Sequence, residues 1–514
     1  METFGAAGFF SVAIYYRSAA DAHYLPLCPI VMKPQHFVDE IGLLSSQELL
    51  RRRAEARRVL GKASHQFHLS SRSLAAGTLT AIMGSVASLP MVARVLAPRL
   101  TSRAKHFASH LVRPPAATNL CIERMIPRNE SEEGIEPGLK QGFTLEEMAN
   151  IVERLLGDLG MNHLSRLVVI LGHGSSSLNN PHESAYNCGA CGGGRGGPNA
   201  RAFALMANDL RVRQLLEARG LTIPASCFFV AGYHNTCDDS IDYLDFDRLP
   251  TSHQEDFLFA KSKLDVARAL NAQERSRRFE LAPLTISPDD ALKHVEARAE
   301  DLAQARPEYN HATNAVCFVG RRMRTRGLFM DRRSFLTSYD PTQDDDSSKV
   351  LNRILQAVIP VCSGISLEYF FSTVDNSIYG CGSKLPHNIT SLLGVMEGAA
   401  SDLKTGLSQQ MTEIHEPLRI IFVIESTPEA MLSIMQRNPN IDRLIRNKWV
   451  QIAMLSPVSN DIRCFENGQF VAYQPSHHLI PTVARSNDWY RGWRNHLGFA
   501  KITAGYASVD SVSK

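Results

Sequence analysis

The chain has 514 residues, of which 44% are hydrophobic and 21% are charged. This length allows several hydrophobic cores and excludes a peptide, a disulfide-stabilised scaffold and a simple coiled coil. Lys and Arg number 55 and Asp and Glu number 52, for a net charge of +3. Such a balance argues against a dedicated nucleic-acid-binding protein. Ten cysteines without a secretory signal favour a reducing cytoplasm over a secreted disulfide framework.

The first third of the chain contains two helical segments and a polar break. Residues 47–60 (QELLRRRAEARRVL) predict a basic helix with a solvated face. Residues 73–93 form the longest uncharged stretch, but their hydroxyls and glycines favour a buried or partner-facing helix over a lipid-facing span. Prolines, glycines and acidic residues cluster in 113–142 and predict a linker or exposed loop.

Helices and apolar strands alternate from residue 143 onward. Thr144 and Glu147 have the spacing of a capping box and predict a helix that continues to Leu156. The short apolar run 166–171 (RLVVIL) predicts a buried strand. The same alternation predicts helices over 200–219 and 256–278, and strands over 227–231, 315–320 and 420–425. We therefore expect an α/β protein with a mixed or mainly parallel sheet and large helical additions.

The most informative segment, 171–201, begins where the strand at 166–171 ends (LGHGSSSLNNPHESAYNCGACGGGRGGPNAR). Sites in α/β sheets form beyond the carboxyl ends of strands, where His173 stands. Cys188 and Cys191 follow in a CxxC pair. Imidazole and thiolate are ligand types that zinc prefers, so these three residues are the metal candidates. A hydrogen-bonded structural histidine and a redox-active or idle CxxC are the alternatives.

The glycine run after the CxxC allows three interpretations. Gly192, Gly194 and Gly197 satisfy GxGxxG, but the run follows its strand by some twenty residues, which is the wrong context for a dinucleotide site. Successive backbone N–H groups with Arg195 could bind a carboxylate-sized anion. A purely conformational role for the glycines is the third interpretation.

Other polar residues predict structural roles. His234 and Cys237 could support a metal site, although a helix capped by Thr236 is the favoured interpretation there. The acidic residues that follow match no calcium loop and predict a solvated acidic face: Asp238, Asp239, Asp242, Asp245 and Asp247. No GxSxG, HExxH or Walker motif occurs in the sequence, which argues against the commonest classes of hydrolase and NTPase.

Several long motifs resemble one known family. They are ETFGAAGFF at residues 2–10, LPLCPIVMKPQH at 25–36, the block 173–201, SYDPTQD at 338–344, and the long segment 359–403 that begins IPVCSGISLEYFF. With these motifs the chain resembles the DabA family from residue 2 to its end. Members are the large soluble subunits of an energy-coupled inorganic carbon (DAB) pump.

The resemblance implies a β-carbonic-anhydrase-like core that binds one zinc ion. In the family, an upstream Cys-x-Asp-x-Arg motif and a downstream His and Cys hold the metal. His173 and Cys188 match the downstream pair, so Cys191 and Arg195 become supporting or anion-binding groups. The upstream motif precedes the ETFG segment in relatives, yet ETFG stands here at residues 2–5. Cys121, Glu123 and Arg124 repeat part of that spacing on the wrong side of ETFG and are a poor substitute.

We therefore expect the C-terminal portion of a longer protein. The expected division is an N-terminal remainder of the core at 1–112, a linker at 113–142, a zinc-site α/β core at 143–340 and a C-terminal α/β portion at 341–514. The resemblance also implies a membrane partner related to antiporter-like subunits of respiratory complex I, and a peripheral place on the cytoplasmic face of the inner membrane.

The resemblance implies zinc-dependent CO2 hydration to bicarbonate, coupled to the membrane partner. Whether the chain itself is an enzyme depends on the half of the metal shell that this sequence does not contain. The alternative is a non-catalytic zinc-binding or scaffold module that keeps the partner-binding surface. The coupling ion, the transported species and the stoichiometry are not fixed by the sequence.

Overall fold

The structure is a computed structural model of the whole chain. It describes residues 2–70, 117–124, 138–176, 194–382 and 406–503, apart from residues 20, 30, 31, 162, 302, 303, 305, 310–312, 477 and 478, together with scattered positions between 77 and 104. Cys188 and Cys191 lie outside the described residues, as does most of the uncharged stretch 73–93.

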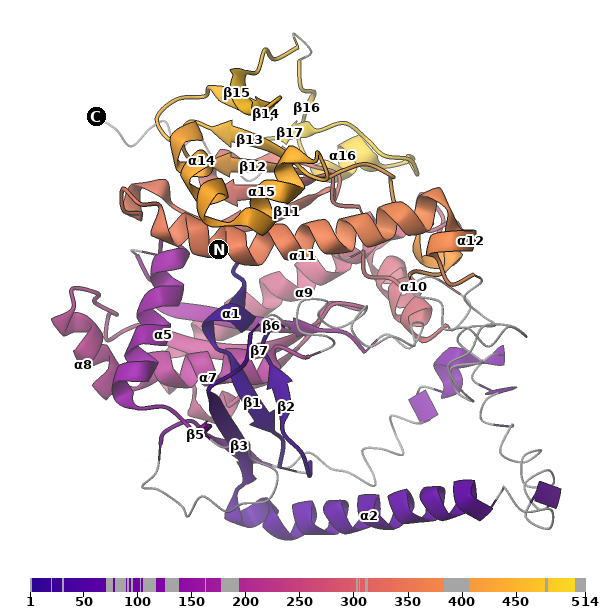
Figure 1. Ribbon diagram of the computed structural model, residues 1–514. Helices are drawn as coiled ribbons and strands as arrows, with labels where there is room; N and C mark the ends of the chain where they lie inside the picture. Colours follow the sequence, from indigo (N-terminus) through magenta and orange to yellow (C-terminus); the bar gives the residue numbers. More distant parts are fainter. Residues whose placement is uncertain are drawn as a thin grey trace.

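Two sheets form the N-terminal half of the molecule (Figure 1). In the first, the strand order is β2-β1-β3-β4, and β5 also pairs with β3. In the second, β6 runs parallel to β7, and β8 is antiparallel to β7. The strands are β1 (Ile14–Arg17), β2 (Leu25–Leu27), β3 (His36–Gly42), β4 (Thr118–Cys121), β5 (Lys140–Gln141), β6 (Leu167–Gly174), β7 (Phe228–Asn235) and β8 (Ser240–Leu244).

One hydrophobic core lies between these sheets and their helices. Fully buried side chains of the core include Ile14, Val38, Met148 and Phe203. The helices of this half are α1 (Gly8–Ser11), α2 (Gln47–Ser70), α5 (Leu145–Asp158), α7 (Gly197–Asn208) and α8 (Leu210–Ala218). Helix α2, which contains the predicted basic helix, extends away from this core (Figure 1).

Helix α5 begins at the predicted capping box. The Thr144 side chain accepts a hydrogen bond from the Glu147 backbone N–H at 3.2 Å, and the Glu147 carboxylate accepts one from the Thr144 N–H at 2.9 Å. These bonds satisfy two of the N–H groups that a helix start leaves unpaired. The predicted helix start is thus confirmed.

The prediction of one helix over 200–219 is wrong. Helix α7 ends at Asn208, and α8 begins at Leu210. Asp209 lies between them with an extended backbone, and its carboxylate accepts a hydrogen bond from the Arg211 N–H at 2.8 Å. Aspartate competes with the helical backbone for N–H groups and so favours a cap over a helix interior.

The predicted linker 113–142 is partly structured. Residues Thr118–Cys121 form β4 beside β3, and Lys140–Gln141 form β5 on the same strand. The polar composition of this segment did not predict these two strands, because a strand that pairs with a distant partner does not require an apolar run.

A six-stranded sheet forms the C-terminal half, in the order β11-β9-β12-β13-β14-β15. The first four strands are parallel, and β14 and β15 are antiparallel. Helices α11, α14 and α15 pack on the sheet around a second core that includes Cys317, Leu355 and Phe422. The elements are β9 (Val316–Gly320), β11 (Ser334–Ser338), α11 (Lys349–Val374), β12 (Ile421–Glu425), α14 (Pro428–Arg437), α15 (Pro439–Arg446), β13 (Gln451–Leu455), β14 (Ile462–Glu466) and β15 (Gln469–Ala472).

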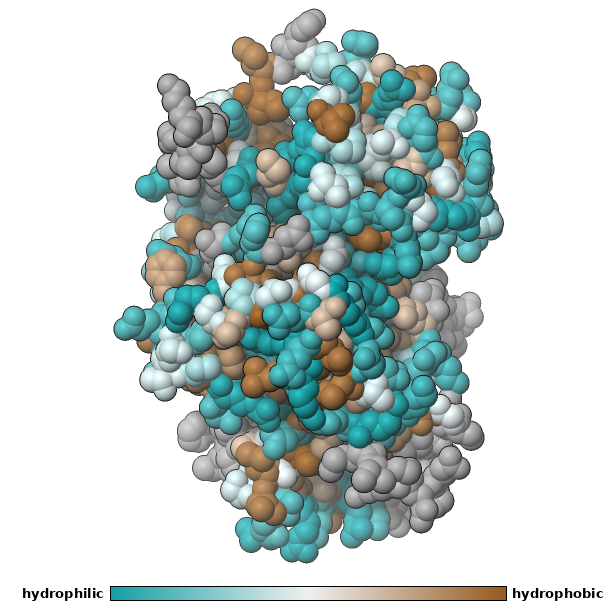
Figure 2. Space-filling model, turned by 90° about the vertical axis from the view of Figure 1, so that its left-hand side faces the viewer, coloured by the Kyte–Doolittle hydropathy of each residue, from teal (hydrophilic) through white to brown (hydrophobic). Residues whose placement is uncertain are grey.

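Helix α11 crosses the middle of the molecule between the two halves, with α9 and α10 nearby (Figure 1). Residues of α9, α10 and α11 share a third core around Phe279 and Tyr369. Hydrophilic residues cover most of the face shown in Figure 2, with apolar groups scattered among them. The remaining elements are α9 (Gln254–Ser276), α10 (Pro288–Glu300), β10 (Leu328–Phe329), α12 (Asn376–Tyr379), β16 (Thr482–Val483), α16 (Ser486–Tyr490) and β17 (Ala500–Ile502).

Candidate functional site

Two glycines allow the start of α7 to lie against the end of β6. A Cβ atom on Gly172 would lie 2.0 Å from the Gly196 carbonyl oxygen, which no side chain tolerates. The Gly196 N–H also donates a hydrogen bond to the His173 carbonyl oxygen at 2.8 Å. The amino end of a twelve-residue helix, with its partial positive charge, is thereby fixed at the carboxyl end of β6.

His173 lies at this carboxyl end of β6 and is exposed. Its ring stands perpendicular to the Phe9 ring, with the centroids 6.3 Å apart. Strand pairing places His173 opposite His234 of β7. The imidazole is thus mounted at the end of a strand, as the sequence predicts, and the structure leaves it exposed. Its predicted co-ligand Cys188 lies outside the described residues, so the pairing of the two stays a prediction.

Arg195 lies beside Tyr233 just before α7. A Cβ atom on Gly174 would meet the Tyr233 hydroxyl at 2.7 Å and the Arg195 Cγ at 3.1 Å, so the two side chains flank the same point of β6. Burial raises the pKa of Tyr233 to about 12, against the opposing effect of the Arg195 charge. The Tyr233 hydroxyl has no hydrogen-bond partner among the described residues. A guanidinium and a phenol at a helix start can bind a small oxyanion.

The predicted helix start at Thr236 is wrong. Strand β7 continues to Asn235, and the chain then turns into the antiparallel strand β8. The Thr236 N–H and hydroxyl both donate to the Gly174 carbonyl oxygen, at 2.8 and 3.1 Å. This turn holds the ends of β6 and β7 together. Thr236 therefore helps to fix the backbone at the end of β6, where the candidate site lies.

The prediction of a solvated acidic face is wrong for two of its five members. Asp239 accepts hydrogen bonds from His234 at 2.9 Å and from the buried Arg275 at 2.8 Å. Burial alone would raise the pKa of Asp239, but the Arg275 charge and the His234 hydrogen bond lower it. Asp245 pairs with the buried Arg201 at 2.6 Å. Both carboxylates are internal ion-pair partners.

Sequence reasoning missed three groups behind the end of β6, which lie near the already considered Cys237: Ser175, Ser176 and Glu308. The Ser175 hydroxyl, fully buried, donates to the Glu308 carboxylate at 2.8 Å. The Ser176 hydroxyl lies 3.4 Å from the Cys237 sulfur. Burial raises the pKa of the Cys237 thiol to about 12, and the Glu308 charge adds to this effect. No local signal in the sequence marks Glu308, which is 133 residues from its serine partner.

The charged side chains of the substitute motif Cys121-Ile-Glu123-Arg124 form ion pairs away from His173. Glu123 receives two hydrogen bonds from Arg211, at 3.0 and 2.9 Å, and Arg124 pairs with Glu147 at 2.7 Å. Within the described part of the chain, no group of three His, Cys, Asp or Glu residues has metal-site geometry. The motif therefore does not complete a shell around His173 within these residues.

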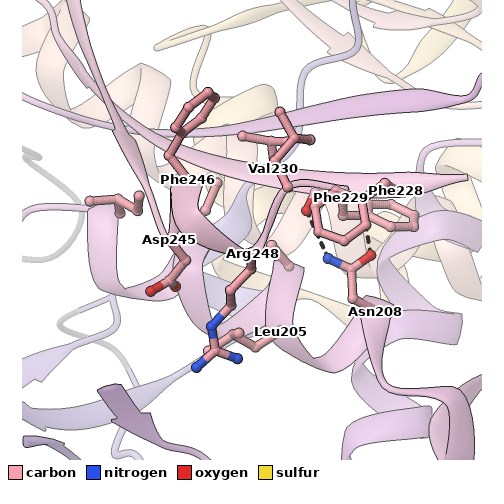
Figure 3. Close-up of a pocket in the computed structure, with 12 residues that line it drawn as sticks. Leu205, Asn208, Phe228, Phe229, Val230, Asp245, Phe246 and Arg248 are labelled. Carbon is pink, nitrogen blue, oxygen red and sulfur yellow. Dashed lines mark hydrogen bonds between the residues drawn. The ribbon is translucent and has the colours of Figure 1, made fainter. Parts of the chain in front are cut away.

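A small pocket lies beside the amino-terminal part of β7 (Figure 3). It holds about 20 Å³, room for roughly one water molecule. The Asn208 amide at its wall pairs with both backbone groups of Phe229, at 2.8 and 3.0 Å. His173 lies at the opposite end of the paired strands, so this pocket does not belong to the candidate site.

Helix α11 is the one described helix whose length and apolar composition suffice to cross a membrane. In its most apolar stretch, 44% of the residues are buried inside the protein. A core helix that joins two halves of a protein has the same composition, so the helix is weak support for a membrane span.

Comparison with known proteins agrees with the motifs around His173. A family model described as "Probable inorganic carbon transporter subunit DabA" matches residues 1–450. A protein of Rhodopirellula baltica named "Probable inorganic carbon transporter subunit DabA 2" is 56% identical over 502 residues, which cover 98% of this chain and 46% of that protein. A DabA 1 of Sorangium cellulosum is 46% identical, with coverages of 98% and 49%. A DabA of Parafrankia is 42% identical, with coverages of 100% and 48%.

The chain spans about half the length of these curated relatives. The family match nevertheless extends over both halves of the structure, including the β6–α7 unit and the strands β9, β11 and β12 of the C-terminal sheet. On this similarity the chain belongs to the DabA family.

Proposed function

We propose that this chain is part of an inorganic carbon transporter subunit and carries half of a zinc site for CO2 hydration. The names of its relatives support the role in inorganic carbon uptake. The observation that carries the chemical proposal is the exposed His173 at the carboxyl end of β6, beside the start of α7 and Arg195. The proposal includes a β-carbonic-anhydrase-like core for the N-terminal half.

The donor set fits half of a zinc shell. His173 offers an accessible imidazole, and Cys188 follows on the segment between β6 and α7. Two further ligands would come from the Cys-x-Asp-x-Arg motif that relatives carry upstream of the ETFG segment. Zinc, when bound, would supply a hydroxide at neutral pH, because it lowers the pKa of bound water to about 7.

The chain's own residues would prepare the site and hold the product. The Gly196 N–H and the Phe9 ring fix the His173 backbone and ring. The Arg195 guanidinium and the Tyr233 hydroxyl flank the end of β6 and would attract bicarbonate. The charge of Arg195 favours an anionic product over neutral CO2, so this side chain would bind product more tightly than substrate.

The 514-residue chain alone is expected to bind zinc weakly, because two ligands leave the tetrahedral shell half filled. Metal content after dialysis against a chelator measures this, with the full-length Rhodopirellula relative as the positive control. Stopped-flow CO2 hydration with a pH indicator then tests activity in the full-length protein. If the lone chain retained zinc and the Cys121→Ser variant lost it, Cys121 would have to be accepted as a zinc ligand. A full-length protein that holds zinc without hydrating CO2 would favour the scaffold alternative.

We also propose peripheral attachment to the cytoplasmic face of the inner membrane through an antiporter-like partner subunit. The chain expressed alone should then be released from membranes by carbonate, and co-expression with the partner should increase the membrane-bound share. Extraction only by detergent would contradict peripheral attachment. It would point to insertion of α11 or of the stretch 73–93.

A further inference from the structure

The positive charge of the chain is concentrated in one stretch of the sequence. Residues 47–104 contain ten Lys and Arg against two Glu, for a net charge of +8. The whole chain has a net charge of +3, so all the other residues together carry −5. A surface that only needs to be soluble mixes both signs of charge, whereas a separate basic segment favours contact with an anionic partner.

Helix α2 carries much of this charge away from the rest of the protein. It follows β3 and extends away from the core of the N-terminal half (Figure 1). Leu50, near its start, is buried, whereas every described position from 54 to 62 is exposed. Most of the stability of a helix in a protein comes from packing on a neighbour. A surface that binds this exposed part of α2 would therefore stabilise it.

Basic side chains of α2 are available to such a surface. Arg51, Arg58 and Lys62 are exposed, and their spacing of i, i+7 and i+11 places them on one side of the helix. The ion pairs of α2 in the described part of the chain use Glu48 and Asp21 and do not involve Arg58 or Lys62. Two positive charges on this side of the helix thus have no protein partner among the described residues.

Exposed apolar side chains accompany the basic ones. Leu89, Val92, Leu96 and Leu100 are helical positions that are 43% to 79% exposed. Their spacing of i, i+3, i+7 and i+11 is that of one side of a helix. The Thr101 N–H donates to the carbonyl oxygen four residues earlier at 3.0 Å, which is the α-helical pattern. A stripe with this spacing normally faces a core, but here these four side chains face solvent.

An anionic lipid surface fits both features. Basic residues and leucines together on helical segments are typical of helices that lie in the membrane interface. The basic side chains attract anionic headgroups, and the apolar ones enter the boundary of the acyl chains. A nucleic acid would leave the four apolar side chains in water.

We propose that a basic arm, formed by α2 and the described positions between 89 and 104, binds the anionic lipid headgroups of the membrane on which the transporter works. The inference deepens the proposed peripheral attachment and rests on it, because the partner subunit determines the membrane and the arm adds a direct contact with lipid. The contact is mainly electrostatic, so salt weakens it. It therefore agrees with the release of the lone chain by carbonate.

The test is sedimentation of the 514-residue chain with vesicles of phosphatidylcholine and phosphatidylglycerol in equal parts. The unmodified chain should bind these vesicles and leave them when salt is added, and it should bind pure phosphatidylcholine vesicles far more weakly. A variant that combines Arg51→Gln, Arg58→Gln and Lys62→Gln should bind at least about tenfold more weakly, because each basic residue near an anionic surface strengthens binding about fivefold.

A matched control combines Lys261→Gln, Lys263→Gln and Lys293→Gln. These changes remove the same charge from exposed positions of α9 and α10, so this variant should bind like the unmodified chain. Leu96→Gln with Leu100→Gln tests the apolar stripe and should remove the binding that persists at high salt. Far-UV circular dichroism checks that each variant is folded.

A second measurement needs no variant. Hydrogen–deuterium exchange of the unmodified chain should become slower in peptides of residues 47–62 when anionic vesicles are added. The inference is overturned if the unmodified chain does not bind anionic vesicles, if the lysine control loses binding equally, if the leucine variant keeps its salt-resistant binding, or if the protection lies outside the arm. Binding only to neutral vesicles that contain the membrane subunit, lost in the α2 variant, would also overturn it and assign the arm to a protein partner.

Vesicle binding requires neither zinc nor CO2 hydration. An assembled transporter that takes up no inorganic carbon would therefore refute the proposed function. The vesicle and exchange measurements would still decide whether the arm binds lipid.

Discussion

Cys188→Ala is expected to abolish zinc retention in the longer protein that includes the upstream segment, whereas Cys191→Ala should weaken it only about ten- to a hundredfold. The reason is that a zinc ligand contributes a metal bond, while a neighbouring thiol acts through packing and hydrogen bonds. His173→Ala should match Cys188→Ala, because His173 is the exposed group at the end of β6. Zinc content after dialysis against a chelator distinguishes the three variants.

Equal and complete loss in both cysteine variants would contradict this assignment. It would indicate a structural His-Cys-Cys site in which both thiolates bind the metal. Retention of zinc in His173→Ala would remove His173 from the site altogether.

Arg201→Met is expected to lower the free energy of unfolding by about 3–5 kcal/mol, because it leaves two internal carboxylates without their cation. Arg201 of α7 donates to Glu40 of β3 at 2.8 Å, and to both oxygens of Asp245 at 2.7 and 2.6 Å. It also donates to the Thr118 carbonyl oxygen at 2.7 Å. The side chain thus ties the first sheet to the second. Urea denaturation followed by circular dichroism measures the loss.

Arg211→Met is the matched control. Arg211 also contacts two carboxylates, Glu123 and Asp209, but its side chain is 51% exposed. An exposed ion pair contributes about 0–1 kcal/mol, so this variant should unfold almost like the unmodified chain. Equal losses of unfolding free energy in Arg201→Met and Arg211→Met would show that the buried ion pairs of Arg201 stabilise the fold no more than the exposed ones of Arg211.

The effect of Arg201→Met should depend on pH. Burial alone would raise the pKa of Glu40, but hydrogen bonds from Thr118 and Tyr16 and the Arg201 charge lower it overall. A carboxylate with a lowered pKa adds stability above its ordinary value of about 4.3, and that stability is lost as the pH falls through the folded-state pKa. The difference in the free energy of unfolding between Arg201→Met and the unmodified chain should therefore become smaller as the pH falls.

The sequence by itself determined the features that depend on near neighbours. The capping box at Thr144 and the strand at 166–171 followed from residue types within a few positions of one another. The position of His173 at a strand end was also predictable, because a short apolar run predicts the strand and α/β topology places sites beyond its carboxyl end. The exposure of His173 came from the structure. The assignments of Cys188 and Cys191 stay predictions, and they came from family motifs.

Only the tertiary structure decided which distant residues meet. Asp239 and Asp245 looked like members of a solvated face, but Arg275 and Arg201 turn them into internal ion pairs. Glu308 carries no local signal, and its hydrogen-bond partner Ser175 is 133 residues away in the sequence. Charged residues prefer water unless a partner compensates their burial. That partner stands tens to hundreds of residues away, so its presence is a property of the fold and not of the local sequence.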